Sequence, residues 1–68
     1  MILIVNGAPH ELAEPCDVAG LVAQTLGDRH APGVAVAVNR TVVPRTDWPR
    51  HRLEPGDRVD IVTAVQGG

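Results

Sequence analysis

A chain of 68 residues with 44% hydrophobic content can bury one small core and has no room for a second domain. Six arginines and no lysine stand against eight acidic residues, and the net charge of −2 provides no general positive field for binding nucleic acid. The single cysteine excludes a disulfide within the chain and suits a reducing compartment.

The sequence predicts two strands at the start of the chain. Residues 2–5 are branched and apolar at every position, which is typical of a strand covered on both sides or central in a sheet. Asn6 and Gly7 tolerate positive φ and predict a turn, from which residues 10–13 can return as the partner strand. The apolar start is too short for a signal peptide or a membrane span. We therefore expect a soluble cytoplasmic protein with no membrane partner.

A helix is predicted next. Asp17 is the expected N-cap, because its carboxylate can accept a hydrogen bond from a free amide of the first turn. Gly27 fits the position after the last helical residue. Gly20 inside the helix costs about 1 kcal/mol relative to alanine, so the helix should depend on packing. Four apolar residues recur at i, i+3, i+4 and i+8 and can form one stripe against a sheet. They are Val18, Leu21, Val22 and Leu26.

The second half of the chain begins with a predicted hairpin. Residues 34–38 alternate valine and alanine, so the valines should face the helix and the alanines the opposite side of the sheet. Asn39 and Arg40 make a tight turn into a strand at residues 41–43. Pro44 ends this pairing because it has no amide hydrogen to donate.

The last predicted strand covers residues 58–65 and follows a loop. The loop, residues 45–55, is rich in charged residues and proline and is expected to contain one short helical turn. Alternation in the strand places Val59 and Ile61 on one face and Val62 on the other. A long crossover can bring the first and last strands side by side and parallel.

These elements predict an α+β fold of the ubiquitin-like β-grasp type, a mixed sheet of four to five strands packed on one helix. We expect a single domain over residues 1–68 with a flexible tail at 66–68. The helix covers one face of the sheet, so Val62 and the alanines can form a small apolar patch on the other face. Such a patch is either a docking surface or an ordinary scatter of surface apolar residues.

The residues with reactive or aromatic side chains form no recognisable catalytic or metal site. Cys16 has no basic neighbour in sequence to lower its pKa, so we interpret its role as structural or incidental. His10, His30 and His51 lack the short spacings of zinc ligands. Trp48, the one aromatic residue, is interpreted as part of the core. With no nucleophile and base pair and no phosphate loop, we expect no catalysis by the chain alone.

The chain stops at Gln66-Gly67-Gly68, directly after a run of apolar residues. Glycine has no Cβ, so a Gly-Gly tail that leaves a rigid strand can lie in a narrow cleft and present its carboxylate to another protein's active site. The tail is therefore the predicted functional end of the molecule.

Two segments carry a resemblance to a known family. Residues 34–48 read VAVAVNRTVVPRTDW, and residues 56–68 read GDRVDIVTAVQGG. Together they resemble the ThiS family, the bacterial sulfur carriers of thiamine biosynthesis, which have a ubiquitin-like β-grasp fold. The resemblance covers essentially the whole chain. It departs from the family at Gln66, where small residues are common, and at Gly20, which interrupts the helix.

The resemblance implies a carrier that is a substrate of other enzymes. An E1-like adenylyltransferase, ThiF, would use ATP and magnesium to convert the Gly68 carboxylate to an acyl-adenylate. Sulfur from a cysteine desulfurase or another persulfide donor would then give a thiocarboxylate, which donates to the thiazole synthase ThiG. Gly67 and Gln66 would thread the partner channels, and the chain itself would bind no cofactor stably. Strand geometry suggests three further partner contacts, namely Val62, Ala64 and Val65.

Other readings of the same features stay open. The small subunit of molybdopterin synthase shares the fold and the tail, although Asn39, Pro44, Arg45 and Trp48 favour the thiazole family. A β-grasp interaction module or a protein modifier would conjugate the Gly-Gly terminus instead of loading it with sulfur. Because the chain has no lysine, it offers no side-chain amine for building chains of itself. A small enzyme would show turnover without a partner.

Overall fold

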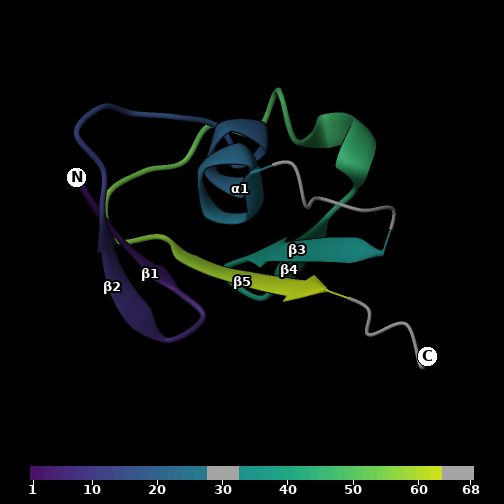
Figure 1. Ribbon diagram of the computed structural model, residues 1–68, viewed down its shortest axis with the longest axis horizontal. Coiled ribbons are helices and arrows are strands. Elements are labelled where there is room, and N and C mark those ends of the chain that lie inside the picture. Colours follow the sequence, from purple (N-terminus) through teal and green to yellow (C-terminus); the bar gives the residue numbers. More distant parts are fainter. Residues whose placement is uncertain (28–32, 64–68) are drawn as a thin grey trace.

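Five strands, one α-helix and a short 3-10 helix form in the part of the chain that the computed structural model describes, residues 1–27 and 33–63. The sheet order is β2-β1-β5-β3-β4, with β1 and β5 parallel and the other neighbours antiparallel (Figure 1). This is the predicted β-grasp arrangement. In chain order the elements are β1 (Ile2–Val5), β2 (Ala8–Glu11), α1 (Val18–Leu26), β3 (Val34–Val38), β4 (Thr41–Val43), η2 (Arg45–Asp47) and β5 (Arg58–Thr63).

Both hairpins turn through two residues with positive φ. Asn6 and Gly7 have φ of 51° and 82°, and Asn39 and Arg40 have φ of 50° and 72°. Positive φ at both central positions is the requirement of the type I′ turn, whose twist matches that of the flanking strands. The two predicted turns are thus confirmed.

The predicted position of the second strand, residues 10–13, is wrong by two residues. The turn contains only Asn6 and Gly7, so Ala8 pairs directly with Val5. As a result β2 begins at Ala8 and ends at Glu11. Pro9, which pairs with Ile4, has no amide hydrogen to donate to the ladder. It is tolerated because β2 is an edge strand, where one side of the ladder needs no partner.

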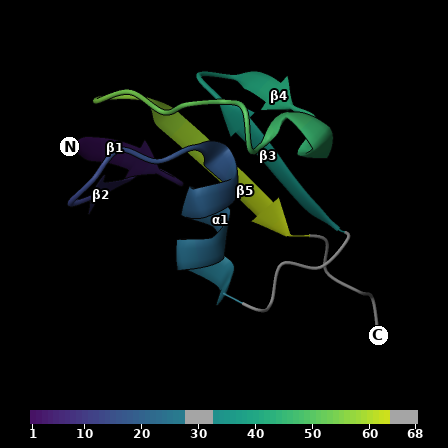
Figure 2. The same cartoon turned by 90° about the horizontal axis from the view of Figure 1, so that it is seen from above.

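The ends of α1 are those that the sequence predicts. The Asp17 Oδ1 atom accepts a hydrogen bond of 2.8 Å from the amide of Gly20 and caps the first turn. Gly27, with φ of 60°, ends the helix, and its amide donates to the carbonyl oxygen of Ala23. Figures 1 and 2 show α1 on one face of the sheet, beside the segment that follows β4.

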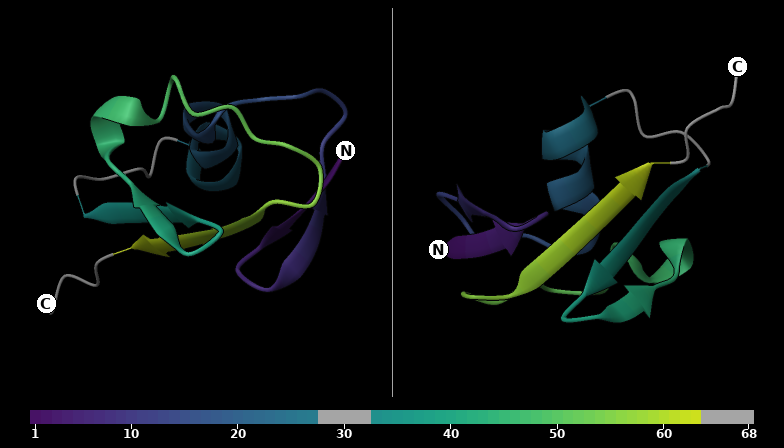
Figure 3. Two further views of the ribbon diagram at one scale, coloured as in Figure 1. Left: turned by 180° about the vertical axis from the view of Figure 1, so that it is seen from behind. Right: turned by 90° about the horizontal axis from the view of Figure 1, so that it is seen from below.

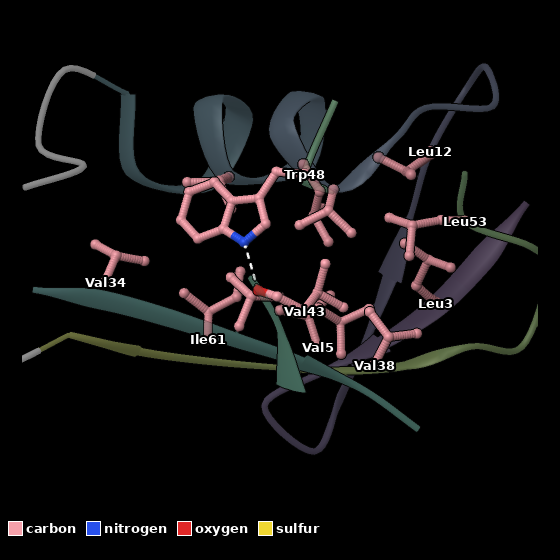
Figure 4. Packing of buried hydrophobic residues seen from close by; sticks show 14 residues of the cluster. Leu3, Val5, Leu12, Val34, Val38, Val43, Trp48, Leu53 and Ile61 are labelled. Carbon is pink, nitrogen blue, oxygen red and sulfur yellow. Dashed lines mark hydrogen bonds between the residues drawn. The ribbon is translucent and has the colours of Figure 1, made fainter. Parts of the chain in front are cut away.

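The core lies between α1 and the sheet, as Figure 4 shows. The three valines of β3 face the helix as predicted, while Leu26 is only partly buried. Trp48 is 5% exposed, and its Nε1 atom donates a hydrogen bond of 2.9 Å to the carbonyl oxygen of Val43, which confirms it as a core residue. The buried hydrophobic residues are Leu3, Val5, Leu12, Val18, Leu21, Val22, Val34, Val36, Val38, Val43, Trp48, Leu53, Val59 and Ile61.

A hydrogen-bonded cluster joins the β3–β4 turn to the turn before β5. The Asn39 Oδ1 atom accepts from the amide of Arg58 at 3.0 Å, and the Asn39 Nδ2 atom donates to Asp57 Oδ1 at 3.1 Å. The other carboxylate oxygen of Asp57 accepts from the amide of Glu54 at 2.9 Å. These bonds fix the residue at which β5 begins. Of the predicted strand 58–65, residues 58–63 are confirmed and the last two lie outside the described residues.

Candidate functional site

The base of the C-terminal tail is β5, the central strand of the sheet. It lies between β1 and β3, in front of α1 when the molecule is seen from below (Figure 3, right). Its last residue, Thr63, pairs with Val34 at the start of β3. Five residues follow Thr63, and five fully extended residues span at most about 18 Å. The length of the tail therefore limits Gly68 to that distance from Thr63, the last residue of β5.

The predicted tail residues lie outside the described part of the chain. They are Ala64, Val65, Gln66, Gly67 and Gly68. The structure thus shows the strand from which the tail starts, and Val62 is the one predicted site residue that it describes. The flexibility expected of residues 66–68 stays a prediction.

Val62 lies on the outer face of the sheet, as predicted, and is 61% exposed. It pairs across the ladder with Ala35, which is exposed on the same face. Ala37 pairs with Val42, which is 70% exposed. We call the set Ala35, Ala37, Val42 and Val62 the sheet patch. Val62 and Ala35 lie at the end of β5 that leads into the tail, and Ala37 and Val42 are in register with Asp60, nearer the middle of the strand.

Polar side chains divide the outer face. Asp60 pairs with Ala37, and Arg58 pairs with Ile4 of β1. Ile2, which is 51% exposed, lies on β1 and is separated from the sheet patch by β5. The face therefore combines an apolar area beside the tail with charges that can select the orientation of a partner.

Asn6 contributes a contact to β5 that the sequence did not indicate. Its backbone amide donates to the carbonyl oxygen of Val59 at 2.9 Å, and its side-chain Oδ1 accepts from the amide of Ile61 at 2.7 Å. The sequence marks Asn6 only as a turn former. The residue that it binds is 55 positions away, so no local pattern could reveal the contact.

Cys16 is half-buried at the entrance to α1. Burial raises the pKa of its thiol above the ordinary value, and the charge of Asp17 raises it further, whereas Arg52 opposes both effects. Arg52 is brought near by a bridge between residues 17 and 52, which the sequence did not predict. A thiol with a raised pKa is a poor nucleophile at neutral pH, which supports a structural interpretation.

An open groove of about 260 Å³ lies on the other side of the molecule, between α1 and the segment that contains η2. The guanidinium of Arg45 lies 5.0 Å from the centre of the Trp48 ring and stacks over it at this groove. The lining residues are Ala19, Val22, Ala23, Arg45, Trp48 and Pro49.

Within residues 1–27 and 33–63, no three His, Cys, Asp or Glu side chains gather into a possible metal site. His10 lies in β2 and His51 in the loop after η2, while His30 is outside those ranges. In the same ranges, the structure contains no helix that is long and apolar enough to cross a membrane.

Comparison with known proteins gives one consistent result. The chain matches the model of the ThiS family over residues 3–68. The sulfur carrier protein ThiS of Escherichia coli strain K12 is 34% identical over 41 residues, which are 60% of this chain and 62% of the E. coli protein. The aligned segment therefore spans less than two thirds of that relative.

Two solved structures are similar over the whole chain. The crystal structure of the thiamine biosynthesis protein ThiS from Geobacter metallireducens gives a TM-score of 0.80 at 31% identity and covers 100% of both chains. A solution NMR structure of a thiamine biosynthesis protein from the same organism gives a TM-score of 0.81 at 29% identity. It covers 100% of this chain and 88% of the other.

Proposed function

The chain belongs to the ThiS family, and from this premise we propose that it is a sulfur carrier protein of thiamine biosynthesis. The Gly68 carboxylate is adenylated and converted to a thiocarboxylate, which donates sulfur for the thiazole ring. The observation that carries the proposal is that the family match runs through the terminal Gly67-Gly68 pair, which follows the central strand of the sheet.

The chemistry requires activation because a carboxylate is a poor electrophile. Attack of a Gly68 carboxylate oxygen on the α-phosphate of ATP releases pyrophosphate and leaves an acyl-adenylate. A persulfide sulfur can then attack the carbonyl carbon, and AMP leaves with the bonding electrons. A second thiol attacks the sulfur on the donor side of the acyl disulfide so formed and ends in a disulfide with the donor; the S–S bond breaks and the thiocarboxylate leaves with the electron pair. ATP and magnesium belong to the activating enzyme, an E1-like adenylyltransferase of the ThiF type. The sulfur comes from a cysteine desulfurase or another persulfide donor, and the thiazole synthase ThiG receives it.

The carrier contributes a rigid body and a narrow tail to this reaction. We assign the docking contacts to the sheet patch through Val62, continued by Ala64 and Val65. Gln66 and Gly67 then thread the channel of each partner, where the absence of a Cβ on glycine lets the tail lie close to the channel walls. Docking of the body holds the carboxylate near the reacting phosphate and raises its effective concentration.

The proposal makes the chain a substrate of its partners and not an enzyme. We assign no part to the half-buried Cys16, because burial and the charge of Asp17 raise the pKa of its thiol and so disfavour the reactive thiolate. Persulfide and thiocarboxylate groups are oxidisable, so the proposed reactions belong in a reducing compartment such as the cytoplasm.

Mass spectrometry of the chain purified from its native host tests the proposal. We expect a fraction of molecules in which one oxygen of the Gly68 carboxylate is replaced by sulfur, and loss of that fraction when Gly68 is deleted. An amide-linked adduct between Gly68 and another protein would instead indicate a protein modifier and would contradict the carrier function.

A further inference from the structure

The two edges of β5 form ladders of different length with their neighbouring strands. On the β3 side the antiparallel ladder continues to Thr63, the last residue of the strand. On the β1 side the parallel ladder contains only the pairs Ile4 with Arg58 and Val5 with Val59. The chain reverses at Asn6, so the backbone of β1 no longer accompanies the second half of β5.

The side chain of Asn6 continues this ladder by one step. In a parallel pair, one residue binds two residues of the neighbouring strand that are two positions apart, through its N–H and its C=O. Asn6 makes the first of these bonds from its backbone amide to Val59 and the second from its side-chain Oδ1 to the amide of Ile61, at 2.9 and 2.7 Å. The amide oxygen thus replaces the backbone carbonyl that the turn has rotated away.

Asparagine combines the two properties that this position needs. It tolerates the left-handed backbone, here with φ of 51°, and its side chain is a hydrogen-bond acceptor. Glycine would satisfy only the first requirement. Aspartate would satisfy both.

We propose that Asn6 is a positioning residue for the C-terminal tail. Its side-chain acceptor fixes the second half of β5 and thereby the point from which the tail reaches the active site of a partner. Ile61 lies two residues before Thr63, the residue from which the tail starts, so a displacement of the Ile61 amide also displaces Thr63. Because adenylation requires reacting atoms within about 3 to 3.5 Å, a small shift of Thr63 lowers the rate of the chemical step. This role rests on the proposed carrier function.

Asn39 provides a matched control within the same molecule. It has φ of 50° in an equivalent turn, and its Oδ1 accepts a hydrogen bond of 3.0 Å from a β5 amide, that of Arg58. That amide is at the first residue of β5, the end away from the tail. Asn39 also binds Asp57, so its loss removes at least as many hydrogen bonds as the loss of Asn6. A purely structural role for both residues would give similar effects on the carrier reaction.

The experiment compares the parental chain with Asn6→Gly, Asn6→Asp and Asn39→Gly, each at a temperature at which circular dichroism shows it folded. Amide hydrogen exchange of Ile61 measures the local bond. ATP–pyrophosphate exchange by the activating enzyme, with the carrier concentration varied, gives kcat and KM for each variant.

Asn6→Gly should lower the protection of the Ile61 amide by about twofold to tenfold, the effect of one lost hydrogen bond. Its kcat should fall at least about threefold while KM changes by less than about twofold, since the docking body is intact. Asn6→Asp should restore both quantities. Asn39→Gly should melt at a temperature as low as Asn6→Gly or lower, yet keep the parental kcat.

Equal kcat in Asn6→Gly and the parental chain would overturn the positioning role, as would an equal loss of kcat in Asn39→Gly or no restoration by Asn6→Asp. If the parental chain itself supports no ATP–pyrophosphate exchange, that result overturns the proposed function and with it the positioning role of Asn6.

Discussion

Trp48 shows how one side chain joins separate parts of this small fold. Its indole is buried and donates to the Val43 carbonyl at 2.9 Å, while its own carbonyl accepts from the amide of Ala19 in α1 at 3.2 Å. The guanidinium of Arg45 lies over the ring. Arg45 and Trp48 belong to the segment that resembles the ThiS family, and in the structure they stack on each other. The residues that carry the resemblance in this segment therefore support the fold.

Replacing Trp48 with phenylalanine should lower the free energy of unfolding by about 1–3 kcal/mol. The change keeps an aromatic ring but leaves the Val43 carbonyl without its donor in a buried position. Urea denaturation of both proteins measures the difference. An unfolding free energy equal to that of the parental chain would show that the buried hydrogen bond contributes nothing.

Cys16 should react more slowly with iodoacetamide in the folded chain than in urea, and its reaction should need a higher pH. The thiolate is the reactive form, and burial with the nearby Asp17 raises the pKa of the thiol in the folded state. Since the folded chain binds the thiol proton more tightly, this contribution to stability is present at neutral pH. It is lost as the pH rises from the pKa of the unfolded chain through that of the folded chain. Equal alkylation rates in both states would contradict the raised pKa.

At the scale of elements, the turns and caps were predictable because their causes are local. Asn6-Gly7 and Asn39-Arg40 form turns through their own backbone preferences, and the helix begins at its predicted cap. The predicted start of the second strand was wrong, because an alternating pattern of only four residues does not define the register of a strand. The contacts of the Asn6 and Asn39 side chains with β5 were unpredictable because they join residues far apart in the sequence.

Gly20→Ala should stabilise α1 and raise the free energy of unfolding by about 0.5–1 kcal/mol. A Cβ built at this position would meet its nearest atoms, in Asp17 and Cys16, at 3.4 Å, which is close to ordinary contact. The backbone amide that receives the cap from Asp17 is unchanged. Thermal melting of the variant beside the parental chain measures the effect. A lower melting temperature would mean that the Asp17 and Cys16 side chains cannot accommodate the methyl group.

At the scale of the whole molecule, the fold could be predicted and the site only in part. Hydrophobic periodicity and turn residues predict the two hairpins and the parallel pairing of the first and last strands, whereas the pairing of β5 with β3 was not predicted. The predicted exposure of Val62 is confirmed. Composition and periodicity do not identify a partner, since the recognising surface is defined jointly with another protein. The function proposed for the Gly-Gly tail depends on the family match, because the two glycines alone do not identify a reaction.

Val62→Thr should raise KM for the activating enzyme by about threefold to tenfold, because a polar group replaces a methyl within the proposed sheet patch. Threonine keeps the branched Cβ that suits a strand. Ile2→Thr is the control, since Ile2 is exposed on the far side of β5. A larger KM effect from the control than from Val62→Thr would remove the sheet patch as the docking surface.

The central claim, that the Gly68 carboxylate is the reacting group, is tested most directly by extending the chain. A variant with two alanines after Gly68 moves the carboxylate from the point fixed by docking and places side chains in a channel shaped for glycine. ATP–pyrophosphate exchange with the activating enzyme is measured for both proteins, after melting curves have shown that their folded bodies are equally stable. We expect exchange with the parental chain and none with the extended one. Exchange at the parental rate with the alanines still attached would contradict it.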